Sequence, residues 1–156
     1  MDSIIDICLS GKFEKNVDSK RRVNLPALLT HDIHDKIFHI TRGPDHNLFV
    51  YPRQVFSEKA KRLNKSFGER GQKDKSKRLY FLETMADAHP VQCDQQGRII
   101  IPQELLDYAQ ISDKILIIGA FEKMIFWNPE LFKKMKQEVQ STEQERVSEY
   151  GWAEEE

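Results

Sequence analysis

The sequence contains few of the residues on which small disulfide-linked or metal-binding domains depend. Only two of its 156 residues are cysteine, Cys8 and Cys93, and their spacing fits neither a metal site nor a disulfide framework. No apolar run approaches the roughly 18 residues of a membrane-spanning helix. The first ten residues carry acids where an export signal carries bases. These absences predict a protein of the reducing cytoplasm that has no membrane partner.

Catalytic and cofactor-binding patterns are missing as well. Among the histidines only His31 and His34 stand close together, and such a pair in a polar stretch is more often solvated surface than a metal site. No Ser or Cys lies in a nucleophile elbow, and residues 68–76 ("GERGQKDKS") lack the Gly-Lys-Ser/Thr ending of a phosphate-binding loop. We therefore expect no enzyme, no cofactor, no metal site and no small-molecule substrate.

The net charge of −1 hides a strong asymmetry along the chain. Residues 137–156 hold seven Glu and one Arg, so this segment carries −6 and the rest of the chain +5. Residues 59–78 hold nine Lys or Arg against two acids, which gives +7. The body of the chain is therefore basic, whereas the acidic tail is typical of a solvated terminal extension.

One nine-residue pattern occurs twice. Residues 18–26 read "DSKRRVNLP", and residues 94–102, which lie 76 positions later, read "DQQGRIIIP". Both begin with Asp, carry Arg fifth and apolar residues sixth and eighth, and end with Pro. The likeness extends on both sides of this charged corner. Each copy predicts a strand, the corner, a second strand, a short helix opened by Pro, a β-hairpin and an amphipathic helix.

The duplication predicts the fold class. A β-unit of about 40 residues cannot bury both faces of its sheet alone, so we expect the two copies to pair about a pseudo-twofold axis into one small β-barrel. The fold would be mainly β with flanking α-helices, and the two corners would lie side by side at one end. The expected divisions are a first unit at 12–59, a basic linker and helix at 60–87, a second unit at 88–131, and a helix end with the acidic tail at 132–156.

Each corner combines turn-forming residues with an outward arginine. Asp18 and Asp94 can accept hydrogen bonds from backbone N–H groups further along the turn, and Gly97 can adopt a positive φ. Arg22 and Arg98 begin strands whose next apolar residues point the opposite way, so the arginines should project from the sheet. One such corner is a weak signal, because many hairpins end in charge. Two corners in register with all the surrounding elements are a much stronger one.

The repeated segments resemble a known family. "GKFEKNVDSKRRVNLPALL" and "VQCDQQGRIIIPQELLDYA", with "TRGPDHNLFVYP" between them and "FWNPELF" after, look like the MraZ family of bacterial transcriptional regulators over residues 11–135. The resemblance implies two tandem SpoVT/AbrB-type DNA-binding units, paired as a double-psi-like barrel, in a cytoplasmic, nucleoid-associated protein that assembles into rings. It also implies binding of double-stranded DNA at short G-rich direct repeats upstream of the division and cell-wall gene cluster, including its own promoter.

The family's motif carries over to both corners with one departure. Arg21 stands where the family usually has the turn glycine, and a positive φ is uncommon for Arg, so a different turn in the first corner is an open alternative. We expect Arg22 and Arg98 to contact bases. Lys20 and Arg21, which precede Arg22, are expected to contact phosphates. The turns themselves should be formed by Asp18, Asp94 and Gly97.

Two other functions compete with DNA reading. The basic stretch 59–78 could serve a ring-forming scaffold or an RNA-binding module, although its simplest interpretation is a solvated helix face and loop. An RNA-binding module is disfavoured, because the chain lacks a strand motif with exposed aromatic residues for stacking unpaired bases. A scaffold without nucleic acid leaves the paired arginine corners unexplained. The resemblance implies a repressor, but repression and activation both stay open.

Overall fold

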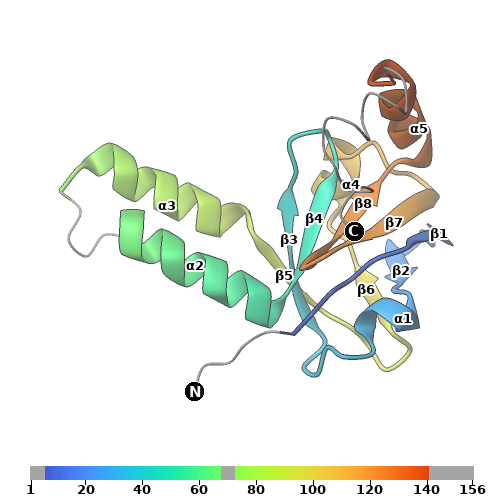
Figure 1. Cartoon of the computed structure of the whole chain (residues 1–156), viewed down its shortest axis with the longest axis horizontal. Coiled ribbons are helices and arrows are strands. Elements are labelled where there is room, and N and C mark those ends of the chain that lie inside the picture. The colour runs from blue at the N-terminus through green and yellow to red at the C-terminus, as the bar shows by residue number, and fades with distance from the viewer. Residues whose placement is uncertain (1–5, 68–72, 141–156) are drawn as a thin grey trace, which may run out of the picture.

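The computed structural model describes residues 6–67 and 73–140. Eight strands and five helices lie within these ranges (Figure 1). The strands are β1 (Lys12–Asn16), β2 (Arg22–Asn24), β3 (Ile37–Arg42), β4 (Leu48–Pro52), β5 (His89–Gln92), β6 (Arg98–Ile100), β7 (Lys114–Ala120) and β8 (Lys123–Trp127). The helices are α1 (Ala27–Thr30), α2 (Arg53–Phe67), α3 (Lys75–Asp87), α4 (Gln103–Tyr108) and α5 (Pro129–Glu138). Most of the predicted acidic tail, residues 141–156, lies outside the described residues.

The order of the elements repeats once. The first copy runs β1–β2–α1–β3–β4–α2, the second runs β5–β6–α4–β7–β8–α5, and α3 stands between them. Pro26 and Pro102 directly precede the short helices α1 and α4. Asn128 caps α5 by accepting hydrogen bonds from the N–H groups of Glu130 and Leu131. The predicted duplication of a mainly β unit with flanking helices is therefore confirmed.

The two copies exchange strands with each other. All pairs are antiparallel, and the six-stranded sheet has the order β1-β7-β8-β4-β3-β5, while β2 and β6 form a separate two-stranded ribbon. The edge strand β1 of the first copy pairs with β7 of the second, and β5 of the second copy pairs with β3 of the first. Each copy thus completes its sheet only with strands of the other, and neither has a separate core.

The strand register defines the pseudo-twofold axis. In the β2–β6 ribbon Val23 pairs with Ile99, and in the large sheet Phe49 of β4 pairs with Ile125 of β8. The members of each pair are also equivalent in the sequence repeat, because both pairs are 76 residues apart. The axis therefore passes between the members of both pairs.

The β2–β6 ribbon covers the inner face of the six-stranded sheet. The sheet ladder ends at β1 and β5, and Val17, just after β1, bridges to Val23 in β2. Side chains of the ribbon belong to the same buried cluster as those of the sheet. The ribbon and the sheet therefore enclose one core, although the hydrogen-bonded ladder does not run continuously around it.

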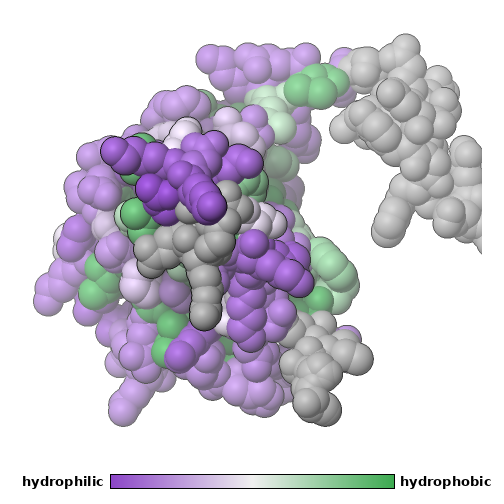
Figure 2. Space-filling view, turned by 90° about the vertical axis from the view of Figure 1, so that its left-hand side faces the viewer, coloured by the Kyte–Doolittle hydropathy of each residue, from purple (hydrophilic) through white to green (hydrophobic). Residues whose placement is uncertain are grey.

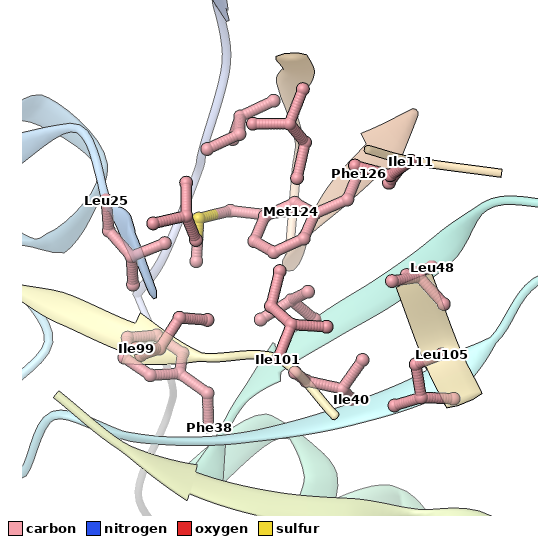
Figure 3. Close-up of a cluster of buried hydrophobic side chains, with 14 of the residues drawn as sticks. Leu25, Phe38, Ile40, Leu48, Ile99, Ile101, Leu105, Ile111, Met124 and Phe126 are labelled. Atoms are coloured by element: carbon pink, nitrogen blue, oxygen red, sulfur yellow. The ribbon is translucent and has the colours of Figure 1, made fainter. Parts of the chain in front are cut away.

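Both copies contribute large apolar side chains to the core (Figure 3). Burying a side chain of this size contributes about 1.5–3 kcal/mol. Strand alternation explains which of these side chains are buried, because residues of one strand face the interior at every second position. Prominent members are Phe38 and Ile40 from β3, Leu48 from β4, Ile99 from β6, and Met124 and Phe126 from β8.

The α2–α3 hairpin projects away from the sheet (Figure 1). Figure 2, which faces this side of the molecule, shows a largely hydrophilic surface with separate hydrophobic patches. Helix α3 buries no residue, and its Leu79 and Leu82, which are 54% and 61% exposed, lack a covering element in the described part of the chain. None of the helices within residues 6–67 and 73–140 has the length and apolarity needed to cross a membrane.

Two neighbouring residues of β6 test this account of the core. Ile99 is 1% exposed and Ile100 is 51% exposed. We expect Ile99→Ala to lower the free energy of unfolding by about 2–5 kcal/mol, because it leaves a cavity. Ile100→Ala should cost less than about 1 kcal/mol, because it removes only outward surface. Urea midpoints at one fixed protein concentration measure both changes. Equal losses would show that the alternation is wrong.

Candidate nucleic-acid interface

The first charged corner is organised by the carboxylate of Asp18. One of its oxygens accepts hydrogen bonds from the backbone N–H groups of Lys20 and Arg22, at 2.9 and 2.8 Å. The other oxygen accepts from Nε of Arg22 at 2.7 Å. The N–H of Arg21 donates to the carbonyl of Asp18 at 2.9 Å, which closes the turn. The aspartate thus holds both the backbone of the corner and the side chain of its arginine.

The second corner repeats this pattern. Asp94 accepts from the backbone N–H groups of Gln96 and Arg98, both at 2.9 Å, and from Nε of Arg98 at 2.8 Å. The N–H of Gly97 donates to the carbonyl of Asp94 at 3.0 Å. Two segments that share only the motif positions therefore fold into the same corner.

Arg21 adopts the glycine conformation of the second corner. Its φ is +64°, against +79° for Gly97. The alternative of a different turn in the first corner is therefore wrong. A left-handed φ costs a residue with a Cβ on the order of 1–2 kcal/mol, and the hydrogen bonds to Asp18 hold the turn against this cost. The first corner therefore has the same left-handed turn conformation as the second, although it has arginine in place of glycine.

The same hydrogen bonds keep both aspartates ionised. The backbone N–H of Arg22 is the main cause that lowers the pKa of Asp18 below its ordinary value of 3.8, and the Arg22 side chain and the N–H of Lys20 add to it. The pKa of Asp94 is lowered in the same way, chiefly by the N–H of Arg98. At neutral pH each corner is a carboxylate–guanidinium pair with a fixed orientation.

The two arginines keep donors available for a ligand. Nε of each is bound to its aspartate, but the terminal nitrogens of Arg22 and Arg98 have no hydrogen-bond partner within the described residues. The side chains are 29% and 28% exposed. A guanidinium that is held at Nε loses little further rotamer freedom when its remaining N–H groups bind an acceptor. The arrangement therefore suits planar acceptors such as base edges or phosphates.

The ribbon brings the two corners together. The N–H of Leu25 donates to the carbonyl of Gly97 at 2.9 Å, and the N–H of Ile101 donates to that of Arg21 at 3.0 Å. Each strand is thereby bonded to the corner of the other copy. Arg22 pairs with Ile100, and Arg98 lies two residues before Ile100 on the same strand. The two arginines are therefore diagonal neighbours on one face of the ribbon. Diagonal neighbours in antiparallel pairs are generally about 7–8 Å apart.

The surroundings of the two corners differ in charge. Lys20 is exposed and Arg21 half-buried, and neither side chain makes an ion pair within the described ranges. Gln96 and Gly97 stand at the equivalent positions of the second corner. The first corner therefore adds two positive charges that the second lacks. Most of the basic stretch 59–78 lies on the α2–α3 hairpin, away from the ribbon (Figure 1).

Sequence reasoning missed two residues of this surface. Asn24 and Ile100 are the outward residues that follow Arg22 and Arg98 by two positions, and both are exposed. The period-two alternation of the strands could have identified them as outward-facing. Only the register shows that each lies opposite the arginine of the other copy.

Other chemistry finds little support in the described parts of the chain. No cluster of three or more His, Cys, Asp or Glu side chains that could hold a metal occurs in residues 6–67 and 73–140. Cys8 and Cys93 are not joined by a disulfide, and burial raises the pKa of the Cys93 thiol, so this thiol is less reactive than a free one.

Comparison with known proteins identifies relatives of both halves. The family model described as "MraZ protein, putative antitoxin-like" matches residues 8–78 and 84–150. Each matched segment contains one corner. The "Transcriptional regulator MraZ" of Finegoldia magna is 35% identical over 124 residues, which cover 80% of this chain and 83% of that protein. The protein of the same name from Clostridium tetani is 30% identical over 146 residues, covering 90% and 97%.

The role of Asp94 predicts a pH-dependent contribution to stability. Its pKa is lower in the folded state than the ordinary 3.8, so its stabilising effect is fully present above that value. The effect is lost as the pH falls through the folded-state pKa. Asp94→Ala should therefore lower the urea midpoint near neutral pH, and the gap from the native chain should shrink below 3.8. Gln96→Ala alters the same corner without removing a carboxylate and should show no such trend. A gap unchanged by acid would contradict the assignment.

Proposed function

Because the chain belongs to the MraZ family of transcriptional regulators, we propose that it regulates transcription by sequence-specific binding to double-stranded DNA through its two corners. The observation that carries the proposal is the pair of guanidinium groups, each held at Nε by an aspartate, on a two-stranded ribbon. The major groove of B-DNA admits such a ribbon. Other β-ribbon regulators dock in this way.

The arginines are the proposed base contacts. A guanidinium can donate two hydrogen bonds to O6 and N7 of one guanine, which contributes about 1–3 kcal/mol of discrimination. Arg22 and Arg98 are diagonal neighbours on the ribbon, so both can enter one groove. Lys20 and Arg21 are proposed to contact phosphates, because a phosphate contact needs charge and reach more than a fixed orientation. Asp18, Asp94 and Gly97 form the turns that position these side chains.

The proposed targets are short G-rich direct repeats upstream of the division and cell-wall gene cluster, including the chain's own promoter, where the protein would act as a repressor. The guanine preference of arginine and the resemblance to the family support this choice. The same function implies that the protein is located in the cytoplasm and is associated with the nucleoid. We assign one corner to each of the units 12–59 and 88–131, with 60–87 and 132–156 as flanking segments.

A homo-oligomeric ring is the proposed assembly. The exposed apolar side chains of α3, Leu79, Tyr80 and Leu82, offer a surface that a neighbouring subunit could cover. One ribbon reads few base pairs, so a single subunit should bind weakly. A ring that engages several repeats at once raises the affinity through effective concentration.

Light scattering tests the assembly. At micromolar concentration we expect a mass several times the 18.3 kDa of one chain. Replacing Leu79 and Leu82 by Lys should lower this mass, because charges would have to be buried at the interface. Lys133→Ala serves as a surface control on α5 and should leave the mass unchanged. A monodisperse monomer of the native chain over this range would exclude the ring.

Binding measurements on arginine variants test the function. Arg98→Ala should weaken binding to a duplex from the chain's own upstream region by about five- to 150-fold, corresponding to about 1–3 kcal/mol. Its binding to a scrambled duplex should change little. Lys20→Ala should weaken binding to both duplexes and reduce the salt slope by about one.

Arg62→Ala is the matched control, because it removes the same charge from α2, on the hairpin that projects away from the ribbon. It should preserve the preference for the upstream duplex. If the double variant Arg22→Ala/Arg98→Ala kept the native affinity and preference, the corners would not be the DNA-reading elements. Preferential binding of single-stranded RNA by the native chain would favour the RNA-binding alternative.

A further inference from the structure

We propose that Asn24 and Ile100 determine sequence specificity, and that each completes a DNA-reading head whose corner comes from the other copy of the repeat. The proposal rests on the function proposed above and deepens it. The first head consists of the corner at Arg22 with Ile100 beside it. The second consists of the corner at Arg98 with Asn24 beside it.

The strand register places each residue next to an arginine. Asn24 pairs with Arg98, and Ile100 pairs with Arg22. Side chains of directly opposite residues on one face of an antiparallel pair have Cβ atoms about 4.5–5.5 Å apart. Val23 and Ile99, between these positions, are each 1% exposed and face the core. The outward face of the ribbon therefore consists of Arg22, Asn24, Arg98 and Ile100, the face that would meet DNA.

Contacts with the turns support the composite heads independently. Oδ1 of Asn24 lies 3.4 Å from the position that a Cβ would take on Gly97, so the amide rests on the turn of the second corner. Ile100 lines one surface hollow together with Arg21, the residue equivalent to Gly97. The two copies thus contribute to each other's corner in the same manner but with different side chains.

The side-chain amide of Asn24 forms no hydrogen bond within the described residues, whereas the amide of Asn128 caps α5 and that of Asn16 accepts from Lys114. Asn is also disfavoured in strands, and the equivalent position holds the strand-favouring Ile100. An unpaired amide carries one donor and one acceptor side by side, ready for a ligand with the complementary pair.

The chemistry of the two residues fits different bases. An Asn amide bonds N6 and N7 of adenine together, and an aliphatic side chain packs against the C5 methyl of thymine. The second head would therefore read a guanine with a nearby adenine, and the first a guanine with a nearby thymine. The basic residues Lys20 and Arg21 belong to the first head alone. Although the ribbon is pseudo-symmetric, its two heads are chemically different, so a bound site has a direction.

The test uses the full chain and a pool of random-sequence duplexes from which bound DNA is selected. The native chain should select a short motif with guanine and A·T positions. Asn24→Ala should lose the preference at one A·T position, and Ile100→Ala at another, while both keep the guanine positions. On single-substituted duplexes, Asn24→Ala should lose at least about fivefold discrimination at the adenine position, because a bidentate hydrogen-bonded pair is removed. Ile100→Ala should lose the preference for thymine at its own position. Ile100→Val retains an apolar contact and should keep most of it.

Three outcomes separate this inference from the function on which it rests. If the native chain selects no motif, the proposed function fails. If it selects a motif that Asn24→Ala and Ile100→Ala leave unchanged, the function stands and the two residues are not specificity determinants. A uniform loss at every position, with a lowered urea midpoint, would show a merely structural role and would also overturn the inference.

Discussion

The antiparallel pairing of β2 with β6 is the interaction on which the rest of the structure depends. Three residues of each strand pair across the pseudo-twofold axis, and the next backbone N–H of each strand bonds to the corner of the other copy. This pairing buries Val23 and Ile99 against the large sheet. It leaves the alternate side chains on one outward face. The core and the candidate interface are thus opposite sides of the same six residues.

The aspartates reconcile two opposing demands on the corners. A free arginine would carry its full charge to DNA but would have to be ordered on binding, at a cost in side-chain entropy. Asp18 and Asp94 fix Nε of their arginines and cancel part of the charge. The arginine side chains are thereby oriented, but their long-range attraction to a negatively charged ligand is weaker. In the proposed complex, the surplus positive charge of Lys20 and Arg21 would restore the attraction to DNA at the first corner.

Local patterns predicted much of this architecture. The repeated motif indicated two equivalent corners on a shared core, and the prolines after the corners indicated the two short helices. Two features depend on long-range strand register, which a single sequence does not reveal. They are the exchange of β1 and β5 and the placement of Asn24 opposite Arg98. The left-handed turn at Arg21 is held by local hydrogen bonds to Asp18, but an arginine in place of glycine gives no sequence signal for a positive φ.

Hydrogen–deuterium exchange on the full chain, with and without upstream duplex DNA, tests the central claim most directly. If the DNA lies on the corners and the ribbon, amides of residues 18–25 and 94–101 should exchange more slowly in the complex. Amides in α2 and α3 should be much less affected by the DNA. Slowed exchange confined to the α2–α3 hairpin, with the corners exchanging as in the free protein, would contradict the claim.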